Sequence, residues 1–207
     1  MIARAAPPRV WQRMLSGRRL DLADPSPFDI EIGDIAHGLA RVARWNGQTS
    51  GAHAFSVAQH SVLVEQIAGL LDPALSSAGR MAALLHDAPE YVVGDMISPF
   101  KALVGGEYKV VEARLQAAIH VRFGLPADRA AGLTEAIKSA DRVAAYFEAT
   151  ELAGFTTGEA EKFFGRPRGV HMAQLELEPW STAEAQRRFL ERFTDLAGAM
   201  AGGIVSA

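Results

Sequence analysis

The sequence predicts an all-α protein, a bundle of about six to eight helices. Apolar residues recur every three or four positions in most segments after residue 30, as one face of a helix requires. The 207 residues are enough for one domain with a sizeable core, and 49% apolar with 22% charged residues is an ordinary soluble globular composition. No internal repeat or low-complexity linker divides the chain. We therefore expect a single domain over residues 1–207, with its core at about residues 32–152.

Composition also limits the function. The chain has no cysteine, which excludes disulfides, thiolate nucleophiles and Cys-based zinc sites, so a metal would be held by imidazole and carboxylate. A net charge of -3 gives no general electrostatic case for a nucleic-acid polymer or a membrane as partner. No apolar stretch approaches the ~20 residues that span a bilayer. The first residues carry Arg4 but no apolar signal segment, and we expect a cytoplasmic protein.

The first third of the chain predicts a lead-in and one helix. Residues 1–30 are rich in Pro, Arg and Asp and indicate an irregular segment with one short turn or hairpin. A helix is expected over about residues 32–43, where Ile35, Leu39 and Val42 recur at helical spacing. The lone His37 in this helix is expected to be structural.

The second helix is expected over about residues 57–71. One face carries Val57, His60, Val64, Ile67 and Leu71. His60 therefore points into the core. It is either an imidazole paired with a backbone group or carboxylate, or a metal ligand, and the pattern leaves both interpretations open.

The third helix begins near residue 74 and ends in an apolar run before the adjacent pair His86-Asp87. Glu90 lies four residues after His86 and three after Asp87, so the three groups can share one face. Pro89 would break the hydrogen-bond ladder of a helix at this point. We expect the helix to end or distort where these groups project.

The remaining helices are expected over about residues 107–123, 126–152 and 181–198, with turns and a short helical piece over residues 154–180. Gly124 suits the end of the first of them, and His120 near that end favours its dipole. Asp141 lies among Ile and Ala residues of the second, either as a solvated residue or as a functional one. Ser181 and Glu184 form a capping-box pattern at the start of the last.

Two polar loops carry further candidates. Arg44 and Trp45 open a Gly-punctuated loop, where they are either surface residues or a guanidinium and an aromatic ring that hold a phosphate and stack a base. Asp95 and Lys101 are the charges of the loop over residues 91–101, and composition alone favours simple solvation for both.

Four side chains stand out because each is polar and faces inward on, or at the end of, an expected helix. They are His60, His86, Asp87 and Asp141. Two imidazoles and two carboxylates suit a divalent transition metal. Four protein ligands on an octahedral ion leave about two positions for water or a substrate oxygen, and such an ion acidifies water and polarises a phosphoryl oxygen.

The order of a His, a His-Asp pair and a later Asp is the signature of the HD-domain metal-dependent phosphohydrolases, which this chain resembles over roughly residues 32–152. The resemblance is to their bacterial 5'-deoxynucleotidase branch and to related phage deoxynucleotide phosphohydrolases. The segments that carry it are Arg44-Trp45, Val57-Ala58-Gln59-His60-Ser61, His86-Asp87-Ala88-Pro89-Glu90, Gly94-Asp95-Met96-Ile97-Ser98-Pro99-Phe100-Lys101, Ser139-Ala140-Asp141 and Glu148. The resemblance implies the all-α HD fold.

The same resemblance implies a role for each candidate residue. The metal ligands would be His60, His86, Asp87 and Asp141. Glu90 would orient or deprotonate the attacking water or protonate the leaving alkoxide, and Asp95 would contact the sugar or assist proton transfer. Arg44 would hold the phosphate, Trp45 would line the sugar and base pocket, and Lys101 would also contact the phosphate. Di-iron relatives use additional His ligands, whereas only His120 lies between Asp87 and Asp141 here, which favours one metal ion.

The implied activity is removal of phosphate from (deoxy)nucleoside 5'-monophosphates. The cofactor would be one divalent transition metal ion, Mn, Co, Ni, Zn or Fe in preference to Mg. Two alternatives remain: a deoxynucleoside triphosphate triphosphohydrolase, and a non-catalytic nucleotide-binding or regulatory protein of the same fold. We expect a small-molecule nucleotide as partner, no nucleic-acid polymer, no membrane, and a homodimer.

Overall fold

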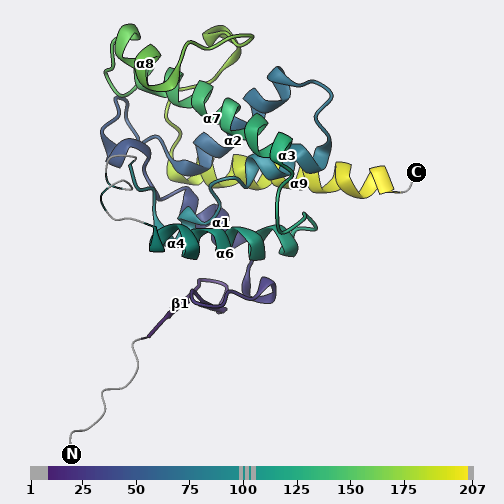
Figure 1. Ribbon diagram of the computed structural model, residues 1–207. Coiled ribbons are helices and arrows are strands. Elements are labelled where there is room, and N and C mark those ends of the chain that lie inside the picture. The colour runs from purple at the N-terminus through teal and green to yellow at the C-terminus, as the bar shows by residue number, and fades with distance from the viewer. Residues whose placement is uncertain (1–8, 98–99, 101–102, 104–105, 205–207) are drawn as a thin grey trace, which may run out of the picture.

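The computed structural model describes residues 9–97, 100, 103 and 106–204. It confirms an all-α bundle, accompanied within the described residues by one small antiparallel sheet (Figure 1). The α-helices are α1 (Ile32–Leu39), α2 (Val57–Leu71), α3 (Ser77–Leu84), α4 (Glu90–Val93), α6 (Glu107–Arg122), α7 (Ala131–Glu151), α8 (Thr157–Phe164) and α9 (Thr182–Ile204). The strands are β1 (Trp11–Arg13) and β2 (Arg19–Asp21), and single 3-10 turns are η1 (Pro27–Asp29), η2 (Arg44–Gly47) and η3 (Met172–Gln174).

Helix α2 is the centre of the bundle, because α3, α7 and α9 all pack on it. Ten of its residues are buried, and its first turn is closed by Ser56, whose hydroxyl accepts from the Gln59 N–H at 3.2 Å. The long α9 runs across α1, α2 and α3, and its C-terminal end extends beyond them (Figure 1). The largest fully buried side chains include Phe55, Phe189 and Met81. A polar side chain on the inner face of α2 is therefore surrounded by protein.

The expected first helix is shorter than predicted, ending at Leu39 instead of residue 43. The physical reason is a long-range pairing that a helical pattern does not reveal. The Val57 N–H donates to Val42 O at 2.9 Å, and the Arg44 N–H donates to Phe55 O at 2.8 Å. These bonds draw the chain out of the helix and lay it beside the entrance to α2, which positions Arg44 next to the core.

The apolar run before His86 ends as predicted, since α3 stops at Leu84 and a turn leads into α4. Pro89 has no N–H for the Leu85 carbonyl. That carbonyl instead accepts from the Ala88 N–H at 3.1 Å and from Gln116 Nε2 of α6 at 3.0 Å. His86 and Asp87 therefore lie in the turn between α3 and α4.

A glycine allows α4 to approach α1 closely. A Cβ on Gly38 would lie 2.8 Å from Tyr91 Cβ and 2.9 Å from Tyr91 O, distances that real side chains do not tolerate. The contact brings the first turn of α4, which begins with Glu90, against the buried side of α1. Any larger residue at position 38 would push this turn outward.

Three other predictions need correction. The last helix, expected over residues 181–198, is α9 and continues to Ile204. The helix expected over residues 126–152 begins at Ala131, because Gly124 at φ +74° reverses the chain and the Leu125 N–H returns to His120 O at 2.8 Å. The capping box at Ser181 is only half formed. Its hydroxyl accepts from the Glu184 N–H at 3.3 Å, but the Glu184 carboxylate binds Arg187 and Arg188.

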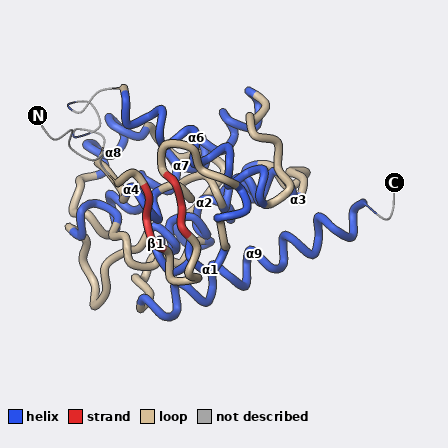
Figure 2. The backbone as a smooth tube through the Cα atoms, turned by 90° about the horizontal axis from the view of Figure 1, so that it is seen from below, coloured by secondary structure: helices blue, strands red, loops and turns tan. Residues whose placement is uncertain are grey.

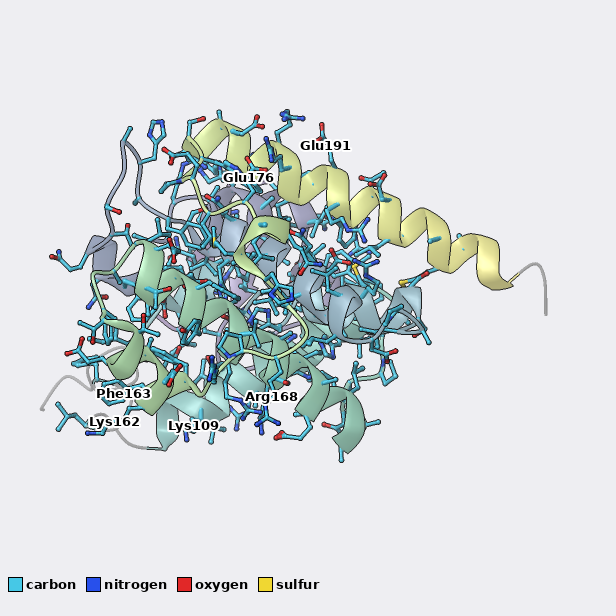
Figure 3. All side chains as sticks on the ribbon, turned by 90° about the horizontal axis from the view of Figure 1, so that it is seen from above. Lys109, Lys162, Phe163, Arg168, Glu176 and Glu191 are labelled. Atoms are coloured by element: carbon cyan, nitrogen blue, oxygen red, sulfur yellow. The ribbon has the colours of Figure 1, made fainter. Side chains whose placement is uncertain are left out.

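The described part of the lead-in, residues 9–30, and the segment over residues 154–180 match their predictions. Strands β1 and β2 form one short hairpin at the edge of the molecule, visible as two neighbouring red strands in Figure 2. The later segment contains α8 and η3 between turns. In Figure 3, Glu191 lies on α9 and Glu176 lies close to that helix. Lys162 and Phe163 lie on the opposite side of the molecule. Among the helices of the described residues, none combines the length and the apolar character needed to cross a membrane.

Candidate metal centre

His60 projects from α2 and is fully buried. Its Nδ1–H donates to Glu148 Oε1 of α7 at 2.5 Å. Donation from Nδ1 leaves the lone pair on Nε2, the atom on the other side of the ring. That Nε2 makes no hydrogen bond within the described structure. The imidazole is thus held by a carboxylate in the orientation found for metal-binding histidines.

His86 is held in the same manner by a different acceptor. Its Nδ1–H donates to Ala83 O at 2.9 Å, and its Nε2 is buried without a hydrogen-bond partner in the described part of the chain. The two imidazole rings lie 5.3 Å apart, centroid to centroid. Two fixed rings therefore direct their Nε2 atoms toward a common space.

Asp87 and Asp141 border this space. Asp141 Oδ1 lies 3.3 Å from His60 Nε2, and Asp87 Oδ2 lies 3.5 Å from His60 Nε2 and 3.2 Å from His86 Nε2. One ligand atom each from His60, His86 and Asp141 lies within 4.8 Å of the others, so these three residues could hold a metal ion. Their donor set, nitrogen and oxygen, suits a divalent transition metal. The Asp141 side chain is 40% exposed, which makes it the open side of the group.

The electrostatics of the group favour a cation. Burial lowers the pKa of His60, but the carboxylates of Glu148, Asp141 and Asp87 outweigh it and hold that pKa well above its ordinary value. Burial raises the pKa of Asp87 and Asp141, whereas the neighbouring imidazoles lower both below their ordinary values. Burial likewise opposes ionisation of Glu148, yet His60 and Arg44 lower its pKa to about 2. A cation in the centre would replace the proton that these carboxylates otherwise hold on His60.

Glu90 lies beside the centre at the start of α4 and is 2% exposed. Burial, together with the charges of Glu112, Glu90 and Asp87, raises the pKa of the Tyr108 hydroxyl on α6. The Tyr108 hydroxyl donates to Glu112 Oε1 at 3.3 Å. The Tyr108 hydroxyl is thus influenced by the charges of Glu90 and Asp87.

Arg44 and Trp45 share Glu148 with His60. Arg44 Nε and Trp45 Nε1 donate to Glu148 Oε2 at 3.3 and 2.9 Å, and Arg44 Nη1 donates to Asp95 at 3.3 Å. The Trp45 ring also packs on Phe155 and Phe164, with centroids 5.6 and 5.9 Å away. Trp45 and the following residue have φ of 56° and 51°, a conformation that side-chain-bearing residues rarely adopt. Local strain here is held in place by the contacts to Glu148.

The structure brings together most residues predicted from the sequence. The four predicted ligands surround one space, Glu90 follows Asp87 in the buried first turn of α4, and Arg44, Trp45 and Asp95 form the neighbouring network around Glu148. Lys101 lies outside the described residues. His37 and His120 are not part of the metal-binding group.

Two residues of the region were not predicted as functional. Glu148 links His60, Arg44 and Trp45, and its place on the same helical face as Asp141, seven residues on, was the available signal. Arg129 precedes α7 and makes no hydrogen bond or ion pair among the described residues. Burial lowers its pKa, while the charge of Asp87 opposes that shift. No sequence pattern marked Arg129.

No protein-family model matches the chain. It is 53% identical over 194 residues to the uncharacterized protein RCAP_rcc00048 of Rhodobacter capsulatus, an alignment that covers 94% of this chain and 99% of that protein. It is 32% identical over 185 residues to the uncharacterized protein YfdR of Escherichia coli K12, covering 89% of this chain and 94% of YfdR. Both matches extend across the centre.

Proposed function

The chain belongs to the family of RCAP_rcc00048 and YfdR, and we propose that it is a metal-dependent phosphohydrolase that releases phosphate from (deoxy)nucleoside 5'-monophosphates. The proposal includes its membership of the HD-domain superfamily, which the order of His60, His86-Asp87 and Asp141 suggests. The cofactor would be one transition metal ion, Mn, Co, Ni, Zn or Fe in preference to Mg. The protein would act as a homodimer in the cytoplasm.

The observation that carries this proposal is the fixed orientation of two imidazoles. His60 and His86 each donate from Nδ1, to a carboxylate and to a carbonyl, and each turns a buried Nε2 toward Asp87. A buried polar atom without a partner costs about 1–3 kcal/mol. Two such atoms beside two ionised carboxylates are stabilised when a divalent ion lies between them.

The chemistry would be divided between the ion and Glu90. When bound, the ion supplies Lewis acidity toward a phosphoryl oxygen. Glu90 is held in a buried turn three residues after Asp87, and we propose that it meets the water that attacks the phosphorus. It would accept the proton of that water as the P–O bond forms and pass a proton to the leaving 5'-oxygen as the other P–O bond breaks. The products are orthophosphate and a nucleoside.

Two arginines have different parts in substrate binding. Arg44 is 14% exposed and is held by Glu148 and Asp95, which leaves Nη2 as its nitrogen without a hydrogen bond among the described residues. Arg129 has no such partner and interacts with Asp87. Arg44 would orient the phosphate with one N–H group, and Arg129 would neutralise its second charge. Trp45 would border the nucleoside, with Asp95 near the sugar.

The two alternatives make different demands on the site. A triphosphohydrolase needs additional cations for three phosphates, and Lys101 is the residue that would extend the phosphate pocket. A non-catalytic nucleotide-binding protein needs the metal group but not Glu90. The position of Glu90 three residues after Asp87, in the first turn of α4, favours an enzyme over a binding protein, because a carboxylate next to a metal ligand can act as a general acid–base group.

One assay separates these possibilities. Metal-stripped protein would be supplied with Mn, Co, Ni, Zn or Mg and a panel of nucleoside mono- and triphosphates. Orthophosphate from monophosphates is the expected product, and tripolyphosphate from triphosphates would indicate the first alternative. No turnover above an Asp87→Ala variant with any metal would refute the enzyme proposal.

Glu90→Ala distinguishes catalysis from metal binding. We expect metal content to stay at the wild-type level while activity falls by about 10²–10⁴-fold, the usual contribution of a general acid–base group. Glu135→Ala, on the exposed side of α7, is the matched control and should change neither. Loss of metal from Glu90→Ala would make Glu90 a ligand instead.

A further inference from the structure

The hairpin of β1 and β2 brings three arginines around one tryptophan. Arg9, Trp11 and Arg13 alternate along the chain and so share one face, and Arg19 is the register partner of Arg13 on that face. The guanidinium carbons of Arg9, Arg13 and Arg19 lie 5.1, 5.5 and 4.3 Å from the centroid of the Trp11 ring. We call these four residues the arginine cluster.

None of the three arginines of the cluster forms an ion pair with a carboxylate of the described residues. Arg13 Nη1 donates to Gly17 O at 2.7 Å, and Arg9 and Arg19 make no hydrogen bond or ion pair among the described residues. Asp21 is the register partner of Trp11, but its Oδ1 accepts from the N–H groups of Ala23 and Asp24. Three like charges near one ring repel one another unless an anion lies between them.

The hairpin that carries the cluster is anchored to the bundle. Asp34 of α1 is 6% exposed and accepts from the Ser16 N–H at 3.0 Å and from the Ser16 hydroxyl at 2.6 Å. Leu20 is fully buried, and Arg18 forms an ion pair with Glu31 at 2.8 Å. The arginines on the opposite face are therefore presented by a fixed backbone, which reduces the entropy lost when a ligand binds.

Charge is distributed unevenly along the sequence. Five arginines and no Asp or Glu fall in residues 1–20, so all 24 acidic residues of the chain come later. The overall net charge of -3 conceals this separation. An anion is attracted to the hairpin and repelled by the remaining surface, which makes the hairpin the favoured place for it.

We propose that Arg9, Arg13 and Arg19 around Trp11 form a binding site for a phosphate monoester or diphosphate group, separate from the metal centre. Guanidinium groups bind phosphate oxygens through paired N–H donors, and an indole ring holds guanidinium groups over its face. Convergence of three arginines on one ring suits a compact anion with two or more charges. An extended polymer would need cations spaced along a groove. This inference does not depend on the proposed phosphohydrolase activity.

The test uses the full chain with its metal removed by a chelator, so that the metal centre does not bind the probe. Inorganic pyrophosphate is titrated by calorimetry at low salt into wild-type protein and into R9Q/R13Q/R19Q. K162Q/R166Q/R168Q is the matched control, because it removes the same number of charges from exposed positions outside the arginine cluster and its anchors. We expect the affinity of the first variant to fall at least tenfold and that of the control to change less than threefold.

Fluorescence and two other probes locate and identify the ligand. Trp11→Phe should remove the pyrophosphate-dependent change in tryptophan emission, and R19Q alone, at the arginine closest to the ring, should weaken binding while thermal unfolding stays unchanged. Equal losses in both triple variants, or emission changes that persist in Trp11→Phe, would overturn the site. If a thymidine oligonucleotide without a terminal phosphate, or phosphatidylglycerol vesicles, bound tenfold more tightly than pyrophosphate, that result would refute the assignment of a compact anion as the ligand.

Discussion

Glu65 and Glu148 are two buried carboxylates with similar surroundings and different consequences. Glu65 is 2% exposed and binds Arg192 through both oxygens, at 2.7 and 2.8 Å, and Arg80 at 2.5 Å. Glu148 is fully buried and accepts from His60, Arg44 and Trp45. Each carboxylate is surrounded by donors. Burial and charge alone therefore do not separate a structural residue from a functional one.

The difference lies in what each cluster leaves without a partner. The Glu65 cluster links α2, α3 and α9 by ion pairs, and its arginines extend to solvent. The Glu148 cluster ends in a buried His60 Nε2 that faces two further carboxylates. A cluster whose charged groups all form ion pairs with one another stabilises the fold. A cluster that ends in an oriented nitrogen atom without a hydrogen-bond partner can bind a ligand through that atom.

The largest expected effect is on the free energy of unfolding, when the Glu65 cluster is broken. Glu65→Ala leaves Arg80 and Arg192 without their anion and should lower the free energy of unfolding by about 3 kcal/mol, the low end for a broken buried ion pair because both arginines are partly exposed. Denaturant unfolding of the metal-free protein measures it. Metal affinity should be unchanged. A tenfold loss of metal affinity in this variant would contradict the structural role.

At the Glu148 cluster, the main effect of a substitution should be on metal affinity. Glu148→Gln weakens the acceptor of the His60 Nδ1–H and should reduce metal affinity by about 10–100-fold, as loss of a ligand's orienting partner usually does. Titration with Co or Zn against a competing chelator measures the change. Glu135→Gln on the same helix is the control. Wild-type affinity in Glu148→Gln would show that the His60 orientation does not depend on this carboxylate.

His120 tests whether an unpartnered imidazole nitrogen is sufficient to mark a ligand site. It is fully buried, donates from Nδ1 to Pro126 O at 3.0 Å, and leaves Nε2 without a partner, yet no carboxylate of the metal group reaches it. Burial lowers its pKa below the ordinary value of 6.5, and the hydrogen bond to Pro126 only partly opposes this.

The unfolded chain therefore takes up a proton at His120 before the folded chain does. Stability is complete above about pH 6.5 and falls as the pH drops below it, by at most about 1.4 kcal/mol per pH unit, until the folded pKa is passed. Thermal unfolding between pH 8 and pH 5 should be less pH-dependent in His120→Asn than in the exposed control His53→Asn. Metal-dependent stabilisation that disappears in His120→Asn would place it in a ligand site.

The smallest expected effect concerns Trp45, whose indole N–H donates to Glu148. Trp45→Phe removes the bond from Nε1 to Glu148 but keeps an aromatic ring against Phe155 and Phe164, so the free energy of unfolding should fall by about 1 kcal/mol. Denaturant unfolding measures this change, and metal affinity should vary less than threefold. A larger loss of metal affinity than in Glu148→Gln would mean that Trp45, and not Glu148, orients His60.

Much of the fold was predictable because helices are specified locally. The apolar face of α2, the stop at Gly124 and the distortion before Pro89 depend on neighbours within a few positions. The same local spacing placed His60, His86, Asp87 and Asp141 on inward faces, and the structure brings them to one space.

The partners of these residues were decided only by the tertiary structure. His60 and Glu148 are 88 residues apart, and Arg44 and Glu148 are 104 apart, distances over which helical periodicity carries no information. The same holds for the pairing that ends α1 early. By itself the sequence determined which residue types face inward. Packing of α2 on α7 determined which of them meet, because hydrogen-bond partners are chosen by position in space.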